Sequence, residues 1–277
     1  MVQSDIIKKH QFNFSKKYGQ NFIFDRNLLQ AIVADSGITK EDHVVEIGPG
    51  AGTLSSMIAT HCKTLTCYEI DTNLRSILDE SLGGYDNVEV IFEDIMKVDM
   101  KALDEKYPNG YHVIANLPYY ITTPILFLFL DNATNLKSMT IMVQKEVGLR
   151  MIAPVGSKDY GALTVSLGYR SHVTYERTVK RQMFTPAPNV DSCIIHIAFD
   201  NEKYAIDNEN ILKRLIRCAF AMRRKTLANN LRQEFGFSLD ACGELLKKAG
   251  LTVDIRGEKL SIEQFVHLSN IITQEKV

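Results

Sequence analysis

Apolar and polar positions along the first half of the chain follow two different periods. Five short runs rich in β-branched residues have strand character: His43–Ile47, Leu65–Ile70, Val88–Phe92, Val113–Ala115 and Met139–Val143. Helical stretches stand between them, over Thr53–Thr60, through Leu74, Ile77 and Leu78, and over Pro124–Leu130. This alternation is typical of a parallel sheet whose strands are joined by crossover helices.

Two later apolar runs follow one another with no clear helix between them. Leu163–Tyr169 and Cys193–Phe199 are therefore expected to pair as an antiparallel hairpin at one edge of the sheet, which brings the sheet to seven strands. Ahead of the first strand, Asp25 is a predicted N-cap for a helix over Leu28–Ala34. The polar segment Asp200–Asn210 has no apolar periodicity, so we predict a linker there and helices beyond it.

A glycine-rich loop, Glu46–Thr53, joins the first predicted strand to the next helix and reads E-I-G-P-G-A-G-T. Glycines allow positive φ and let the backbone approach a ligand closely, and a helix start offers free N–H groups. A phosphate-binding P-loop needs a Lys after its last Gly, and a dinucleotide fingerprint has the spacing G-x-G-x-x-G. The spacing G-x-G-x-G suits a ligand without a pyrophosphate, such as S-adenosylmethionine. A tight turn with no ligand is the simpler alternative.

Carboxylates follow the second and third strands, at the sheet edge where open α/β folds bind ligands. Glu69 is expected to accept two hydrogen bonds from a ribose, and Asp94 to accept one from an adenine amino group. Ile70 and Ile95 are placed to pack on the faces of that adenine. The alternative is a solvated acid at each strand end, and for Asp71 a helix N-cap is the favoured interpretation. Three strand ends around one ligand indicate an adenosyl group.

A proline turn, Asn116-Leu117-Pro118-Tyr119, follows the fourth strand. An adenine amino nitrogen is a poor nucleophile, and a site helps it by accepting hydrogen bonds from the amine. The Asn116 side-chain oxygen and the Leu117 carbonyl are the candidate acceptors. Pro118 would fix the turn and Tyr119 would stack on the base. In isolation such a turn merely ends a strand, but downstream of the cofactor residues it predicts amine methylation.

Composition narrows the class of protein without identifying a partner. The 277 residues are 45% hydrophobic and 23% charged, with 32 Lys and Arg against 33 Asp and Glu. The most apolar stretch, Ile121–Leu130, is far shorter than the roughly 20 residues of a membrane span, and the N-terminus lacks a signal peptide, so we expect a cytoplasmic protein. The five cysteines have no C-x-x-C spacing and the histidines no H-x-x-x-H spacing, which predicts buried thiols and no metal site.

At this point the chain resembles a known family, the KsgA/RsmA-type ribosomal RNA adenine dimethyltransferases. Besides the turn, four segments are similar to motifs of that family over nearly the whole chain. They are Lys17–Ile23 (K-x-G-Q-N-F-L, with Ile23 in place of Leu), Phe184–Ser192 (F-x-P-x-P-x-V-x-S), Phe220–Leu227 (F-x-x-R-R-K-T-L) and Leu260–Leu268 (L-S-x-E-Q-F).

The resemblance implies a Rossmann-like class I methyltransferase domain over residues 1–200, with an N-terminal arm over 1–24, and a small helical rRNA-recognition domain over 201–277. It implies that Asn21 and Ile23 contact the cofactor's methionine end beside Gly48, and that Phe184 stacks on the target adenine opposite Tyr119. The remaining cofactor residues would be Gln20, Glu46, Gly50, Glu69, Ile70, Asp94, Ile95 and Asn116.

The reaction that the resemblance implies is N6-dimethylation of two adjacent adenosines in the 3′-terminal hairpin of 16S rRNA. S-adenosylmethionine would be the methyl donor and S-adenosylhomocysteine the product. The expected partner is a precursor of the 30S subunit, with a role in its biogenesis. The enzyme is expected to be a monomer without metal or membrane attachment.

A basic stretch is the candidate RNA surface. Ile211–Arg232 contains no acid. On one helix, an arc of roughly 120° would hold Lys213, Arg214, Arg217, Arg224 and Lys225, with Arg223 pointing elsewhere. A solvated helix face is the alternative, but the lack of acids favours phosphate contact. Further candidates are Arg170, Arg177, Lys180 and Arg181, and at the N-terminus Lys8, Lys9, Lys16 and Lys17.

Three other functions compete with this interpretation. A 23S rRNA adenine methyltransferase of the macrolide-resistance type would share the fold, but such enzymes read S-Q-N-F and N-I-P-Y where this chain has Gly19 and Leu117. A non-catalytic ribosome assembly factor, or a transcription factor with this fold, is disfavoured by intact Glu69, Asp94 and Asn116. A nicotinamide oxidoreductase is disfavoured by the glycine spacing.

Overall fold

A computed structural model describes residues 6, 7, 9, 10, 12 and 18–275 of the chain. The chain divides into two compact units. One comprises the described parts of Met1–Gly148 together with Thr174–Ala198, and the other comprises Leu149–Val173 with the described part of Phe199–Val277. The helical unit therefore includes Leu149–Val173, a segment that the sequence placed with the first domain.

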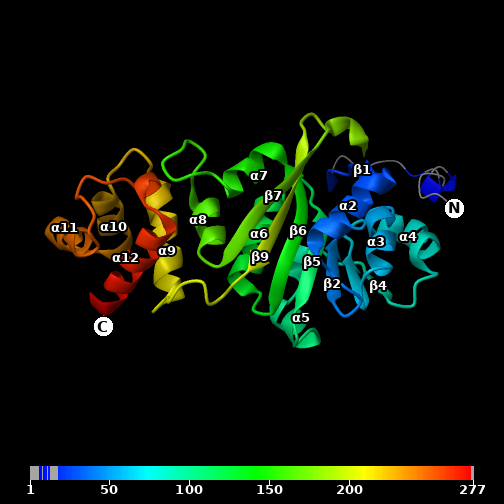
Figure 1. Ribbon diagram of the computed structural model, residues 1–277, viewed down its shortest axis with the longest axis horizontal. Coiled ribbons are helices and arrows are strands. Elements are labelled where there is room, and N and C mark those ends of the chain that lie inside the picture. The colour runs from blue at the N-terminus through cyan, green and yellow to red at the C-terminus, as the bar shows by residue number, and fades with distance from the viewer. Residues whose placement is uncertain (1–5, 8, 11, 13–17, 276–277) are drawn as a thin grey trace. The chain divides into compact units, whose positions relative to one another are not determined.

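The first unit is built on a mostly parallel seven-stranded sheet, as predicted (Figure 1). The five parallel strands lie in the order β4-β3-β2-β5-β6, and β9 and then β7 complete the edge beyond β6. β9 runs antiparallel to β6. The bounds are β2 (His43–Ile47), β3 (Thr64–Tyr68), β4 (Val88–Ile91), β5 (Tyr111–Asn116), β6 (Leu136–Gln144), β7 (Ser171–Val179) and β9 (Ser192–Phe199).

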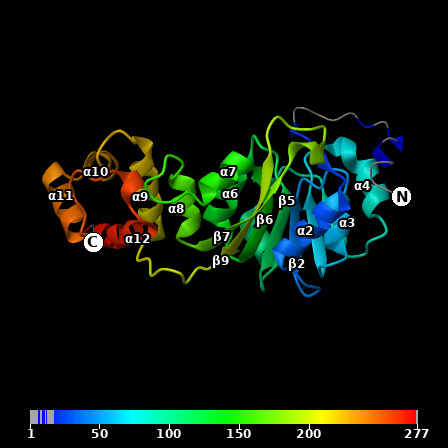
Figure 2. The same cartoon turned by 45° about the horizontal axis from the view of Figure 1, so that its top comes forward.

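Helices cover the sheet, and Figure 2 shows α2 and α3 running beside β2. Alternate residues of each strand face opposite sides, so Val44 and Ile114 pack with Ile32 and Ile58 of α2 and α3 in one apolar core. Asp25 caps α2 by accepting a hydrogen bond from the Leu28 N–H, as predicted. The helices of this region are α2 (Arg26–Ser36), α3 (Thr53–Ala59), α4 (Arg75–Leu82), α5 (Met100–Lys106), α6 (Thr122–Asn132) and α7 (Lys145–Met151), with short 3-10 turns η2 (Thr72–Leu74), η3 (Ile95–Lys97) and η4 (Arg181–Met183).

The strand predicted over Leu163–Tyr169 is wrong, because this segment is helix α8 (Ala162–Gly168). Its residues are buried on nearly every side, so no polar face marks the helical period. Gly168 also needs its small size, since a Cβ there would lie 2.2 Å from Cδ1 of Ile262. The partner of β9 at the sheet edge is instead β7, which has only two buried residues and so lacks the apolar run that marks the other strands.

The second unit is helical and has its own core (Figure 1). Leu215, Leu231, Leu246 and Phe265 are fully buried in that core, one from each of the helices α9 to α12. Asn208 and Ser238 cap α9 and α11. The helices are α9 (Glu209–Ala221), α10 (Leu227–Phe235), α11 (Leu239–Lys248) and α12 (Ile262–Glu275), with a 3-10 turn η5 (Gly257–Lys259).

The N-terminal arm packs on the first unit through apolar side chains. Ile6, Ile7 and Phe22 share a core cluster with Ile77 and Leu78 of α4. The arm's strand β1 (Phe22–Ile23) pairs antiparallel with β8 (Phe184–Thr185). The five cysteines are buried and free, as their scattered spacing predicted.

Candidate active site

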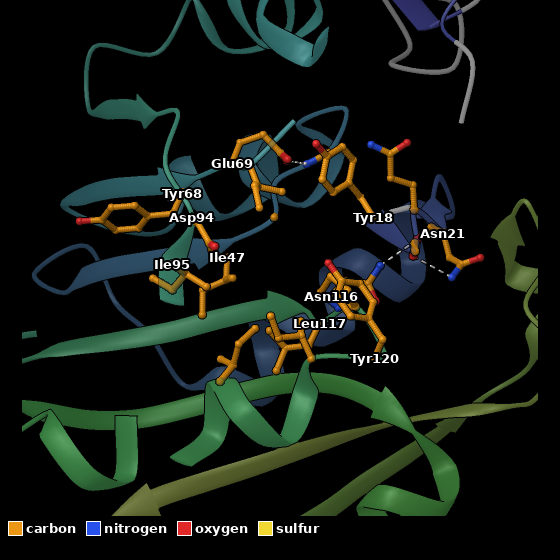
Figure 3. A pocket seen from close by; sticks show the side chains of 18 of the residues that line it. Tyr18, Asn21, Ile47, Tyr68, Glu69, Asp94, Ile95, Asn116, Leu117 and Tyr120 are labelled. Atoms are coloured by element: carbon orange, nitrogen blue, oxygen red, sulfur yellow. Dashed lines mark hydrogen bonds between the residues drawn. The ribbon is translucent and has the colours of Figure 1, made fainter. Parts of the chain in front are cut away.

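Four neighbouring strands end around one cavity (Figure 3). Ile47, Glu69, Asp94 and Asn116 line it, each at or just beyond the carboxyl end of its strand. Because parallel strands point the same way, residues far apart in sequence meet at this edge. The cavity encloses about 790 Å³ including its open mouth. Of the predicted site residues it brings together Gln20, Asn21, Gly48, Gly50, Glu69, Ile70, Asp94, Ile95, Asn116, Leu117, Pro118 and Tyr119.

The glycine loop has the backbone that its sequence predicts. Gly48, Gly50 and Gly52 have φ of 69°, 59° and 77°, in the left-handed region that favours glycine. At Gly50 space is also limiting, since a Cβ there would lie 2.8 Å from Cε1 of Phe22. The loop and the arm therefore pack together closely beside the cavity.

Glu69 is a buried carboxylate on the cavity wall, with 4% of its surface exposed. The Gly50 N–H donates to its Oε2 at 3.2 Å and the Asp71 N–H to its Oε1 at 2.8 Å. Burial raises the pKa of Glu69, while these two backbone bonds act in the opposite direction. Each oxygen of a carboxylate can accept a second hydrogen bond, so Glu69 is able to accept a pair of hydroxyl groups.

Asp94 and two isoleucines form the next part of the wall. One Asp94 oxygen accepts from the Met96 N–H at 3.0 Å, which caps η3 and fixes the side chain. Its remaining acceptor positions suit an amino group. Ile70, which is 42% exposed, and Ile95, which is buried, both line the cavity and give it apolar surface.

The arm is attached to the strand ends by amide side chains. Asn116 Nδ2 donates to the Asn21 carbonyl at 2.8 Å (Figure 3). Gln20 Nε2 donates to Asp71 Oδ2 at 2.7 Å. Asp71 also accepts from the Asn73 N–H, and it is the predicted N-cap. Since the Asn116 amide nitrogen is engaged by the arm, its oxygen is the atom left to accept a hydrogen bond from a ligand.

The turn after β5 holds an aromatic ring in a fixed place. The Leu117 N–H donates to the Met142 carbonyl at 3.1 Å, which continues the sheet into the turn. The Ile121 N–H then donates to the Pro118 carbonyl at 3.2 Å. The Tyr119 hydroxyl lies 2.6 Å from Oγ of the buried Ser192, and burial raises the pKa of Tyr119. The ring is thus anchored at its far end.

Glu46 and Ile23 lie beside this cavity rather than in it. They line a smaller neighbouring cavity that shares Gly48 and Asn116 with the first. Glu46 is 1% exposed, and burial raises its pKa to about 7. The Cys67 thiol donates to Glu46 Oε2 at 3.5 Å. A carboxyl group in this environment exchanges its proton near neutral pH.

Phe184 does not line the cavity in this structure. It is 3% exposed and packs in the apolar core with Leu29 and Val33, directly opposite Ile23 in the small β1–β8 sheet. Successive residues of a strand face opposite sides, so Phe184 points inward and Thr185 outward. The sequence placed the Phe184 ring opposite Tyr119 in the cavity. In this structure the ring is buried in the core instead.

The predicted single basic helix is also corrected. α9 ends at Ala221, and Met222 leaves the helical conformation with φ of −129°. The Lys225 N–H donates to the Met222 carbonyl at 2.9 Å, so residues 223–225 form a turn before α10. Basic residues of this stretch therefore belong to two different local structures.

Acids just outside this basic stretch neutralise part of it. Arg214 pairs with Glu234 at 2.8 Å, and Lys213 lies 3.4 Å from Glu209. Arg223 donates to the backbone carbonyls of Lys158 and Tyr160 at 3.0 and 2.9 Å, which is a contact within the fold. Four cations of the predicted set are exposed on the surface, Arg217, Arg223, Arg224 and Lys225, and of these Arg223 is bonded to backbone carbonyls.

The secondary basic candidates make contacts within the protein. Arg170 bonds Asn201, Arg177 pairs with Asp35, Lys180 pairs with Asp191, and Arg181 donates to the Asn189 carbonyl. Lys9 pairs with Glu80 at 2.8 Å. Lys8, Lys16 and Lys17 lie outside the described residues.

Several aromatic residues that line the cavity were not predicted. Tyr18 and Phe22 belong to the same arm motif as Gln20, and Tyr68 is the last residue of its strand. Their position beside predicted site residues is the feature of the sequence that could have identified them. Tyr120, which directly follows the predicted turn, also lines the cavity. Within the described part of the chain, no group of three or more His, Cys, Asp or Glu side chains could hold a metal ion. No helix in that part is long and apolar enough to span a membrane.

Comparison with known proteins gives a consistent result. The family described as "Ribosomal RNA adenine dimethylase" matches residues 11–274. A "Ribosomal RNA small subunit methyltransferase A" of Clostridioides difficile is 43% identical over 272 residues, covering 97% of this chain and 94% of that protein. The protein of the same name from Oceanobacillus iheyensis is 41% identical over 276 residues, covering 98% and 94%.

Solved structures agree with this result at the level of the fold. A dimethyladenosine transferase from Plasmodium falciparum superposes with a TM-score of 0.80 at 25% identity, covering 92% of this chain and 98% of that one. The 23S rRNA methyltransferase ErmE gives a TM-score of 0.70 at 24% identity, covering 92% and 100%. The second likeness shows a shared fold only.

Proposed function

The chain belongs to the ribosomal RNA adenine dimethylase family, and from this we propose that it dimethylates N6 of two adjacent adenosines in the 3′-terminal hairpin of 16S rRNA. The observation that carries the proposal is the meeting of Glu69, Asp94 and Asn116 around one cavity in a chain that matches this family almost throughout. The enzyme is a methyltransferase that uses S-adenosylmethionine.

The residues of the cavity fit this cofactor. S-adenosylmethionine supplies an activated methyl group on a sulfonium centre. The buried Glu69 carboxylate matches a ribose diol, and Asp94 matches an adenine amino group between Ile70 and Ile95. We assign the methionine end to Asn21 and Gly48, with Gln20 and Gly50 beside them and with Glu46 and Ile23 in the adjoining cavity. The product S-adenosylhomocysteine would bind to the same residues.

The target amine would be held by the turn after β5. Asn116 Oδ1 and the Leu117 carbonyl accept its two hydrogens, while Pro118 fixes the turn and Tyr119 stacks on the base. A base taken out of its helix needs such a stacking partner. Rate acceleration comes mainly from holding the amine in line with the methyl group. Phe184 has no role in this proposal, because its ring is buried.

We propose that the helical unit, including residues 201–277, contacts rRNA through its exposed cations. Arg217, Arg224 and Lys225 are the proposed phosphate contacts. Lys213, Arg214 and Arg223 shape this surface through their contacts inside the protein. The proposed substrate is a precursor of the 30S subunit, in the cytoplasm where ribosomes assemble. We propose that the enzyme acts on it as a monomer.

Methyl transfer from labelled S-adenosylmethionine tests this function. Small-subunit particles from a strain that lacks the modification are incubated with the purified protein, beside large subunits as a control. Labelled N6,N6-dimethyladenosine near the 3′ end of 16S rRNA is the expected product. Label in 23S rRNA would instead identify a resistance-type methyltransferase. No label in either subunit would leave a non-catalytic assembly factor.

A further inference from the structure

Tyr120 is the most exposed large hydrophobic side chain in the described part of the chain, at 60%. Its position is at the cavity, which it lines together with Pro118 and Tyr119 (Figure 3). Scattered exposed apolar residues are ordinary on a protein surface. An aromatic ring beside a cavity that is proposed to hold a nucleobase is a candidate for stacking.

The backbone places two tyrosines next to each other but in different environments. Tyr119 and Tyr120 are the central residues of the turn that the Ile121 N–H to Pro118 carbonyl bond closes. Tyr119 is half-buried and anchored to Ser192, whereas Tyr120 is exposed. Both residues line the cavity, so one turn places two tyrosines at its wall.

The arm supports the Tyr120 ring from one side. A Cβ on Gly19 would lie 3.4 Å from Cδ1 of Tyr120 and 3.8 Å from Cβ of Pro118, so the glycine backbone and the proline lie close to the ring. Gly19 has φ of 60°, a conformation that other residues rarely adopt. The ring is therefore backed by the arm while most of its surface remains open to solvent.

We propose that Tyr120 is a positioning residue that stacks on the nucleotide next to the target adenosine, outside the cavity. This inference rests on the proposed function, in which the two target adenosines are adjacent. When one base leaves the RNA stack to enter the cavity, its neighbour loses a stacking partner. Tyr120 replaces that partner and so holds the strand in place for each of the two adenosines in turn.

The test compares Tyr120→Ala, Tyr120→Phe and the natural enzyme on small-subunit particles that lack the modification. Loss of one base–aromatic stack predicts a fall in kcat/KM of about 5-fold to 150-fold for Tyr120→Ala, through a higher KM for the particle. Tyr120→Phe keeps the ring and should retain the natural rate. S-adenosylhomocysteine affinity and the melting temperature should be unchanged in both variants. A residue that only supported the fold would instead alter one or both of these quantities.

Particles with uridine in place of the neighbouring adenosine provide the decisive comparison. Uridine stacks less well, so the natural enzyme should methylate the remaining adenosine more slowly, while Tyr120→Ala should show no further loss. Equal sensitivity of both enzymes to uridine would overturn the inference, as would a Tyr120→Phe variant as slow as Tyr120→Ala. If the natural enzyme itself transfers no methyl to the particle, the proposed function fails instead.

Discussion

The Glu69→Gln variant is expected to lose much of its affinity for the cofactor. Glu69 already accepts one backbone bond on each oxygen, from Gly50 at 3.2 Å and from Asp71 at 2.8 Å. If the amide oxygen keeps the shorter bond, the amide NH2 faces the Gly50 N–H and cannot accept from the ribose. One hydrogen bond to a charged group is lost, which is worth about 1.5 to 3 kcal/mol.

That free energy corresponds to a dissociation constant for S-adenosylhomocysteine that rises about 12-fold to 150-fold. Titration calorimetry measures it directly, and the melting temperature of the free protein reports any loss of folding. A matched ligand control is the 2′-deoxy analogue of S-adenosylhomocysteine, which lacks one of the two hydroxyls. If Glu69 binds the ribose, the losses from the variant and from the analogue should be less than additive.

The pH dependence provides a second check on Glu69. Burial raises its pKa, and only the charged carboxylate accepts both hydroxyls. Cofactor affinity should therefore fall as the pH is lowered toward that pKa, and this fall should be weaker in Glu69→Gln. An unchanged dissociation constant in the variant, or full additivity with the 2′-deoxy analogue, would refute the assignment of Glu69 to the ribose.

Three further predictions concern stability and RNA binding. The pKa of Glu46 is raised to about 7, so the folded protein holds this proton more tightly than the unfolded chain, and stability falls as pH rises from about 4.5 through 7 by at most about 3 kcal/mol. Glu46→Gln should abolish that fall, which urea unfolding at pH 5 and pH 8.5 measures. Arg223→Ala should cost about 1–3 kcal/mol of stability, because it removes two bonds to backbone carbonyls. Arg224→Ala with Lys225→Ala should instead reduce the slope of log affinity for RNA against log salt by about 1.4 to 1.8.

The predictions for Glu46 and for the double variant of Arg224 and Lys225 can each be contradicted by experiment. A stability difference between Glu46→Gln and the natural protein that does not change with pH would mean that Glu46 is charged in the fold. The double variant of Arg224 and Lys225 should keep its melting temperature and its cofactor affinity. Unchanged RNA affinity at low salt would remove both residues from the proposed RNA surface.

The cofactor side of the site was predictable because strand order fixes which residues meet. Glu69 and Asp94 each follow a strand of a parallel sheet, and such strands end at one edge. Gly50 was predictable for a local reason, since its positive φ favours glycine, whereas the close approach of Phe22 is a tertiary contact. These features depend on chain direction and backbone conformation, which the sequence pattern records.

The basic surface was only partly predictable, because charge neutralisation depends on tertiary contacts. Arg214 lies in a stretch without acids, yet Glu234 reaches it from the next helix. The inward position of Phe184 likewise depends on its pairing with Ile23 across more than a hundred residues of sequence. The strand expected at Leu163–Tyr169 failed because a helix buried on most sides shows no polar face.

The identity and number of the methyl groups transferred decide whether this chain is a dimethyltransferase of 16S rRNA. After exhaustive reaction with S-adenosylmethionine, the 3′-terminal fragment of 16S rRNA is digested and its nucleosides are measured by mass spectrometry, with Asn116→Ala as the control. We expect two adjacent N6,N6-dimethyladenosines, four methyl groups in each particle, and a large loss of rate in the control. Methyl groups at another atom or another RNA, or full activity of Asn116→Ala, would contradict this expectation.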